Sequence, residues 1–170
     1  DVSALGKEVV SKGFTALKTN ILFPGDPGHV YFPGRQQGGA TDQVASNALI
    51  DHIVTLLGTF RDAIGPENDL LLDLNFNFKP ESCLEIARAV ESLHLLWLEI
   101  DLYEPEALAR VREKTSTRIC TGETLYYERA FLPYLQAGAS DFLMIDVPWN
   151  GFGPSKRMGE LAQTFQMNVA

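Results

Sequence analysis

A repeat of short apolar runs constrains the fold of this chain more than any other feature of its sequence. Four of the runs occupy residues 70–73, 95–99, 119–123 and 142–146, and each ends in a carboxylate. From one run to the next, these carboxylates stand 26, 24 and 23 residues apart. Amphipathic helical patterns separate the runs. Largely apolar strands that alternate regularly with such helices predict an α/β fold with a parallel sheet.

This alternation defines the elements that we expect along the chain. A helix-like stretch over residues 4–12 ends at a glycine, as helices commonly do. The strands are expected at about 14–18, 69–73, 95–99, 118–122 and 142–146, with a sixth beginning at 167. The helices are expected at roughly 43–64, 80–92, 105–114, 129–137 and 155–165.

Two α/β architectures fit such an alternation. An open doubly wound sheet tolerates irregular units and usually carries a glycine-rich phosphate loop after its first strand, and the sequence has no such loop. The near-constant period favours a TIM-type (β/α) barrel, which places functional groups at the C-terminal ends of its strands. Six strands cannot close an eight-stranded barrel of ~250 residues. We therefore expect residues 1–170 to be part of a larger barrel.

Composition and charge exclude several classes of partner. The chain has 170 residues, and 14 Lys and Arg residues against 22 Asp and Glu residues give a net charge of −8. This acidic balance, without a run of basic residues, argues against nucleic-acid binding. The apolar runs are far shorter than the roughly 18 residues of a membrane span. Cys83 and Cys120 lack metal-site spacing and are expected to be reduced thiols of a cytoplasmic protein.

One connection is much longer than the others. Lys18 and Asp73 stand 55 residues apart, and the excess lies in residues 21–41, which are rich in proline and glycine. This segment is expected to be a long loop at the catalytic end of the sheet, either a wall or lid of the site or a surface insertion without a role. Its side chains suited to an anionic substrate are those of His29, Tyr31 and Arg35.

Carboxylates at successive strand ends predict a metal site. In one barrel mouth they would repel one another unless a cation neutralised them. Oxygen ligands of this kind suit a hard divalent ion such as Mg²⁺. The alternative is a set of unrelated helix N-caps and surface carboxylates, because aspartate is also common at the start of a helix.

Five motifs, in order and spacing, resemble the enolase superfamily in its mandelate racemase/muconate lactonizing enzyme branch. They are Gly-Phe-Thr-Ala-Leu-Lys at 13–18, Asp-Leu-Asn at 73–75, Leu-Trp-Leu-Glu at 96–99, Thr-Gly-Glu at 121–123, and Gly-Ala-Ser-Asp-Phe-Leu-Met-Ile-Asp at 138–146 followed by Gly-Phe-Gly at 151–153. The resemblance implies strands two to seven of a modified (β/α)7β barrel. An N-terminal capping domain and the last barrel strands would lie outside this chain.

The resemblance also implies roles for individual residues. Asp73, Glu99 and Glu123 fall where the family has its Mg²⁺ ligands. Lys18 falls at the lysine of the second strand, and Asp146 at the aspartate that pairs with a seventh-strand histidine. That histidine would follow Ala170, because His52, within a helix, and His94, before a strand, are expected to be structural.

The implied reaction removes the proton α to a carboxylate and gives an enediolate, whose charge a magnesium ion and a nearby lysine stabilise. Lys18 is followed by Thr19-Asn20 rather than by a second lysine, and asparagine cannot abstract a proton. This pattern is similar to that of the acid-sugar dehydratases. The favoured reaction is therefore that of a lyase, the dehydration of a sugar acid to a 2-keto-3-deoxy acid. The resemblance also implies that the protein is a homo-oligomer. Asn20 and Asn75 are expected to bind substrate, Asn75 from the strand face that carries Asp73.

Alternatives remain open at this stage. A racemase, epimerase or cycloisomerase of the same superfamily is one, and a non-catalytic acidic α/β module is another. The family's usual Glu-Glu-Pro is replaced here by Glu99-Ile100-Asp101, which leaves the role of Asp101 undefined. Tyr126 and Trp149 are expected to be core aromatic residues.

Overall fold

The computed structural model describes residues 1–32 and 44–170 of the chain. Within these ranges, one sheet contains six parallel strands in the order β1 (Ala16–Asn20), β4 (Asp69–Asp73), β5 (Trp97–Glu99), β6 (Ile119–Thr121), β7 (Phe142–Leu143) and β8 (Asn168–Val169). Each strand pairs with the strand that follows it among these six, so the sheet grows in one direction. A doubly wound sheet would reverse direction at a switch point. The predicted barrel architecture is confirmed.

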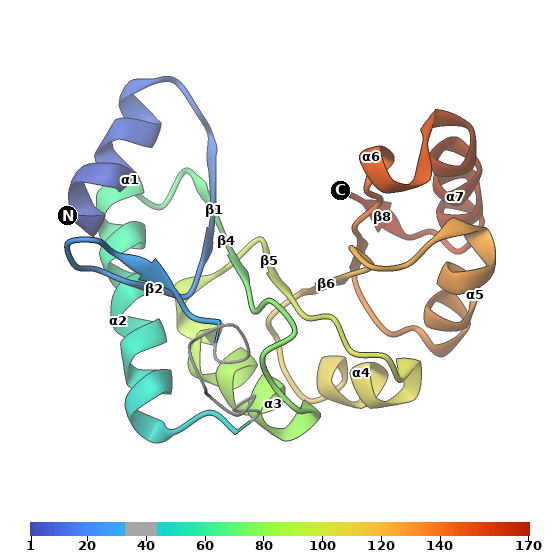
Figure 1. The fold of residues 1–170 in the computed structure, drawn as a ribbon, viewed down its shortest axis with the longest axis horizontal. Coiled ribbons are helices and arrows are strands. Elements are labelled where there is room, and N and C mark those ends of the chain that lie inside the picture. The colour runs from blue at the N-terminus through green and yellow to red at the C-terminus, as the bar shows by residue number, and fades with distance from the viewer. Residues whose placement is uncertain (33–43) are drawn as a thin grey trace.

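The helices lie along one side of this sheet. They are α1 (Val2–Ser11), α2 (Asn47–Ile64), α3 (Pro80–Ala89), the 3-10 turn η1 (Glu91–Leu93), α4 (Pro105–Arg112), α5 (Tyr127–Ala137), α6 (Val147–Asn150) and α7 (Phe152–Thr164). Figure 1 shows the longer helices as an arc around the strands, with the opposite side of the sheet uncovered by helix. Successive helices of the arc contact one another, as in the outer ring of a barrel.

Alternation along the strands separates the core from the open side. The main core cluster includes Leu70 and Leu72 of β4 and Leu98 of β5, which face the helices. Because successive side chains on a strand point to opposite faces, Asp73 and Glu99 face the open side. Both side chains are nevertheless buried. Leu71, on the same face as Asp73, is buried as well, so the charged groups occupy only the strand ends of that face.

Several predicted strand ends need correction. β1 begins two residues later than expected and continues to Asn20. Asp73 and Glu99 end their strands as predicted, but β6 ends at Thr121, so Glu123 lies in the turn beyond it. β7 is only two residues long, although the Met144 amide still bonds the Thr121 carbonyl at 2.9 Å. Asp146 precedes the short helix α6, which the sequence analysis did not predict.

The connection expected to be a loop over residues 21–41 contains a small hairpin. Strands β2 (Leu22–Phe23) and β3 (His29–Val30) pair antiparallel, outside the main sheet. The Phe23 ring stacks on the His52 ring, with centroids 4.2 Å apart, and on the His29 ring at 5.3 Å. His52 also contacts the Leu22 carbonyl at 2.7 Å through Nε2. His52 therefore has the structural role expected of it, because it anchors the hairpin to α2.

Candidate metal centre

Three of the predicted ligands lie together at the C-terminal ends of the strands. One carboxylate oxygen from each of Asp73, Glu99 and Glu123 lies within 4.8 Å of the other two. The register explains the first pair, since Asp73 and Glu99 are direct neighbours across β4 and β5. Glu99 is 1% exposed and Asp73 is buried, while Glu123 is partly exposed. These three residues are called the acidic trio below.

Glycine at position 122 brings Glu123 into the trio. Gly122 has φ +127°, a backbone conformation that side chains disfavour. A Cβ atom there would lie 2.7 Å from the Met144 carbonyl oxygen and 3.1 Å from the Phe131 ring. The chain can therefore turn sharply after β6 only with glycine at this position. That turn directs Glu123 towards the two strand-borne carboxylates.

Lys18 supplies the positive charge of the site. Its ammonium group donates a hydrogen bond to Glu99 Oε2 and lies 3.5 Å from Asp73 Oδ2. Lys18 stands on β1 beside β4, one residue before Thr19 and two before Asn20. Because Asn20 pairs in register with Asp73, it ends β1 next to the trio. The structure thus brings Lys18, the trio and Asn20 to one edge of the sheet.

Burial and mutual repulsion perturb these groups. Burial, followed by the charge of Asp73, raises the pKa of Glu99 to about 7. The pKa of Glu123 is also raised, by burial first and then by the charge of Asp73. Burial lowers the pKa of Lys18, but its hydrogen bond to Glu99 and the two nearby carboxylate charges outweigh that effect and raise it. The site is therefore short of positive charge.

These residues fit a magnesium ion. Glu99 Oε1 is buried and has no hydrogen-bond partner among residues 1–32 and 44–170. A buried carboxylate oxygen of this kind costs free energy unless a cation or a donor meets it. The donors are all carboxylate oxygens, which Mg²⁺ prefers. Three ionised carboxylates opposite one ammonium leave two negative charges, which one divalent cation would balance. Asp73, Glu99 and Glu123 would hold the ion.

Asp101, whose role is not defined by the sequence, supports this site. It is buried, and its Oδ1 accepts hydrogen bonds from the Thr121 hydroxyl and the Gly122 amide. Burial raises the pKa of Asp101, and these two hydrogen bonds oppose that shift. The departure from Glu-Glu-Pro at Asp101 was visible in the sequence, but its hydrogen-bond partners at the end of β6 and in the following turn were not.

Asn75 lies near the trio for a different reason from the one predicted. β4 ends at Asp73, and Asn75 adopts a left-handed conformation with φ +55° in the following turn. Its amide donates to Asp73 Oδ1 at 2.8 Å, and its Nδ2 donates to the Asp73 carbonyl at 3.2 Å. The expectation that strand alternation would place Asn75 beside Asp73 is wrong. A turn places it there instead, as asparagine readily allows.

Of the residues proposed from the long connection, His29 and Tyr31 are described, and neither joins the trio. His29 is exposed on β3, stacked against Phe23. The Tyr31 ring stacks on Phe78 at 5.8 Å and packs against the core. Arg35 lies outside the described residues. Substrate contacts by His29, Tyr31 and Arg35 stay predictions.

Tyr126 and Trp149 are not core residues, contrary to expectation. Tyr126 is 49% exposed and Trp149 is 63% exposed. Trp149 stands on α6, the unpredicted helix that begins after Asp146. Both rings line a cavity that also reaches Glu123 and Asn75.

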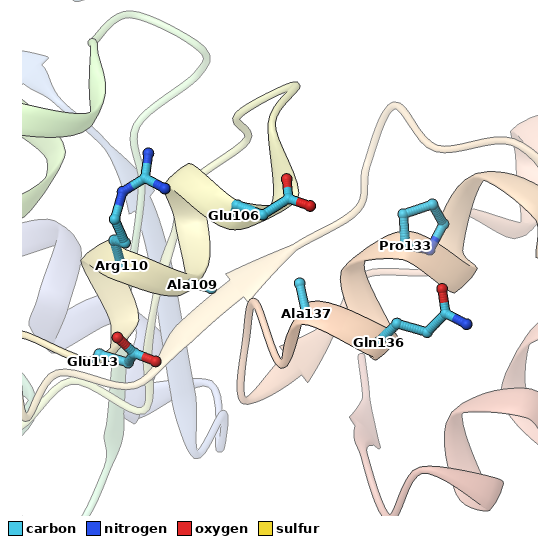
Figure 2. A pocket seen from close by; sticks show the side chains of 7 residues that line it. All are labelled: Glu106, Ala109, Arg110, Glu113, Pro133, Gln136 and Ala137. Atoms are coloured by element: carbon cyan, nitrogen blue, oxygen red, sulfur yellow. The ribbon is translucent and has the colours of Figure 1, made fainter.

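A second hollow lies on the helical side of the sheet, between α4 and α5, with a volume of about 430 Å³. Figure 2 shows Glu106 and Arg110 of α4 on one wall, and Pro133 and Gln136 of α5 on the other. Its described lining contains no histidine or cysteine and none of the strand-end residues. The acidic trio is therefore the better candidate for the functional site.

A one-directional parallel sheet with an acidic trio at its C-terminal edge defines a barrel domain with a candidate metal site. The family model described as "Enolase C-terminal domain-like" matches residues 1–170. The chain belongs to this family, which confirms the resemblance inferred from its motifs. Among the described residues, no helix is both long and apolar enough to cross a membrane.

Curated relatives of the chain include two sugar-acid enzymes. The L-talarate/galactarate dehydratase of Salmonella typhimurium is 32% identical over 109 residues, covering 62% of this chain and 27% of that protein. The D-gluconate dehydratase of Thermoproteus tenax is 28% identical over 167 residues, covering 96% of this chain and 30% of that protein. The chain thus spans less than a third of the length of either dehydratase.

A solved structure gives a close structural match. It is a proposed L-alanine-DL-glutamate epimerase from Burkholderia xenovorans, bound to magnesium and fumarate. The identity is 35% and the TM-score is 0.92, over 99% of this chain and 42% of the epimerase chain. The similar proteins therefore include both dehydratases and a proposed epimerase.

Proposed function

We propose that residues 1–170 form part of the catalytic barrel of a magnesium-dependent lyase that removes the proton α to a carboxylate and dehydrates a sugar acid to a 2-keto-3-deoxy acid. The observation that carries this proposal is the acidic trio with Lys18 beside it. The dehydratase relatives support the choice of reaction. A capping domain and the last barrel strands belong to the rest of the proposed enzyme.

The side chains of this chain have separate tasks in the proposed reaction. Lys18 is cationic and lies at the trio, so it stabilises negative charge that develops on the substrate carboxylate. A magnesium ion held by the trio would supply Lewis-acid stabilisation of the same charge. Asn20, the neutral residue two positions after Lys18, contributes a hydrogen bond rather than a second base. One base must then perform the proton transfer.

We assign that base to a histidine paired with Asp146. An aspartate that accepts a hydrogen bond from an imidazole fixes its tautomer and raises its basicity. The Ile145 amide donates to the Ala170 carbonyl at 3.1 Å, so β8 runs beside the segment that leads into Asp146. A histidine a few residues after Ala170 on the same strand would lie next to Asp146. His29, His52 and His94 have other surroundings.

Epimerisation is the second candidate, because the structural match from Burkholderia xenovorans is a proposed epimerase. Exchange with solvent deuterium distinguishes the two reactions. An epimerase exchanges the α hydrogen without forming a 2-keto acid, whereas a dehydratase forms the 2-keto-3-deoxy product.

The test uses the whole protein that carries this chain. A library of sugar acids is assayed for 2-keto-3-deoxy products, and Mg²⁺ binding is measured by calorimetry. We expect product from at least one acid and loss of measurable Mg²⁺ binding in the Asp73→Asn and Glu99→Gln variants. Asp69→Asn is the matched control, because Asp69 is exposed at the opposite end of β4. Mg²⁺ affinity that is equal in all three variants would contradict the metal site.

A further inference from the structure

A cavity of about 360 Å³ continues from the acidic trio. Glu123 belongs both to the trio and to the cavity wall. Asn75, which is hydrogen-bonded to Asp73, lines the cavity as well. Its volume falls in the range of small-molecule sites, ~300–1,000 Å³. A ligand whose one end lies at the trio can therefore extend into this space.

Four aromatic rings wall the cavity: Phe32, Phe76, Tyr126 and Trp149. They come from the chain after β3, the turn after β4, the turn before α5 and helix α6. The Phe76 ring is also held by Tyr103, with centroids 5.9 Å apart. Tyr126 and Trp149 are exposed, and large exposed rings gathered in one place usually mark a binding surface.

The segments that carry these rings are tied together. Asn150 of α6 is buried, and its Oδ1 accepts a hydrogen bond from the Tyr127 amide at 3.0 Å. Its Nδ2 donates to the Asp146 carbonyl at 3.2 Å. The Asn150 side chain therefore joins helix α6, which carries Trp149, to the turn that carries Tyr126. On the opposite wall, Asn75 and Phe76 both have positive φ, at 55° and 56°. Asparagine tolerates this conformation, but for Phe76 it is strained, and such strain clusters at functional sites.

Polar groups stand between the rings. Glu123, Thr124 and Asn75 complete the lining. A chain of CHOH units matches this mixture, because its C–H face packs on an aromatic ring while its hydroxyl groups pair with amide and hydroxyl side chains. A purely hydrocarbon group would leave these polar groups unpaired, at a cost in binding free energy.

We propose that this cavity, walled by Phe76, Tyr126 and Trp149, binds the hydroxylated carbons of the substrate that are remote from the reacting carboxylate. The proposal rests on the function proposed above and names its substrate class: polyhydroxy acids long enough to reach from the acidic trio to Trp149. Six-carbon aldonates are therefore better substrates than four-carbon acids. The discrimination arises from ring stacking in the cavity.

Chain length provides the kinetic test, in the whole protein with Mg²⁺. The probes are D-gluconate, with six carbons, and D-erythronate, with four. We expect Trp149→Ala to raise KM for D-gluconate by about tenfold and to leave KM for D-erythronate within about twofold. Trp149→Phe keeps a ring and should raise KM for D-gluconate by no more than about threefold. Phe152→Ala is the control, because Phe152 is an exposed ring outside the cavity lining.

Fluorescence tests binding separately from turnover. The difference between the emission of the parent protein and that of Trp149→Phe isolates Trp149, and D-gluconate should quench it. If the protein turns over sugar acids but Trp149→Ala changes KM equally for D-gluconate and D-erythronate, the cavity proposal is overturned and the proposed function stays intact. Quenching without turnover of any acid supports the cavity and contradicts the dehydratase. A lower KM for an aryl hydroxy acid than for D-gluconate also overturns the proposal.

Discussion

Asp101 Oδ1 accepts hydrogen bonds from the Gly122 amide at 2.9 Å and from the Thr121 hydroxyl at 3.0 Å. This oxygen connects the segment after β5 to the turn after β6. Asp101 follows Glu99 by two residues, and Gly122 directly precedes Glu123. A single buried carboxylate thus links the positions of two members of the acidic trio.

Removal of the Asp101 carboxylate is predicted to weaken metal binding. In Asp101→Ala, the Gly122 amide loses its partner and the Glu123 turn is less fixed. We expect Mg²⁺ affinity to fall by about tenfold in calorimetry, as is typical for residues that orient metal ligands. Asp101→Asn is the control, because one amide oxygen can accept both hydrogen bonds, and its affinity should stay within about threefold. Equal losses in the two variants would show that charge, not orientation, matters here.

The architecture was predictable from the sequence because its signals are local and repeated. The strands around Leu70–Leu72 and Leu98 are buried on both faces, so they read as continuous apolar runs. The near-constant spacing of the runs then implied a sheet that grows in one direction. The strand expected over 118–122, with Glu123 at its end, stops at Thr121, because the left-handed turn at Gly122 interrupts the ladder before the apolar pattern ends.

The finer parts of the site depend on contacts that no local pattern records. Asp101 bonds a residue 21 positions further along the chain, and a lone aspartate after a strand gives no sign of this partner. The exposure of Trp149 follows from helix α6, whose four residues are too few to show periodicity. Aromatic residues near strand ends usually read as core, so the cavity wall was missed.

Substitution of Gly122 is predicted to destabilise the fold, because a side chain there is disfavoured both by its φ and by a close contact. In Gly122→Ala, the new methyl group meets the Met144 carbonyl and must adopt φ +127°. We expect the free energy of unfolding to fall by about 2–4 kcal/mol, measured by chemical denaturation of the whole protein. Gly58→Ala is the matched control, because Gly58 lies inside α2 with open space around it. That variant should gain about 0.5–1 kcal/mol, and an equal loss in both would refute the steric argument.

Lys18→Met is predicted to change metal affinity and turnover in opposite directions. The Lys18 ammonium occupies Glu99 and Asp73 oxygens that a divalent cation would also use. Without it, the trio keeps its full negative charge, and Mg²⁺ affinity measured by calorimetry should rise several-fold. The rate constant kcat should fall by about 10²-fold or more, because the substrate carboxylate loses a cationic partner. A fall in both quantities would indicate that Lys18 mainly holds the trio in place.

Arg112 and Asp141 are predicted to stabilise the end of β6 opposite the trio without affecting the metal site. Asp141 Oδ2 accepts a hydrogen bond from the Ile119 amide at 2.9 Å, and Arg112 Nη2 lies 2.7 Å from Asp141 Oδ1. Asp141→Ala leaves the Ile119 amide without that acceptor, so we expect a loss of about 1–3 kcal/mol in the free energy of unfolding. Mg²⁺ affinity should stay within about twofold of the parent. In barrels, groups at the N-terminal ends of the strands stabilise the fold and groups at the C-terminal ends carry the function. A large loss of Mg²⁺ affinity in Asp141→Ala would contradict this separation of the two ends of β6.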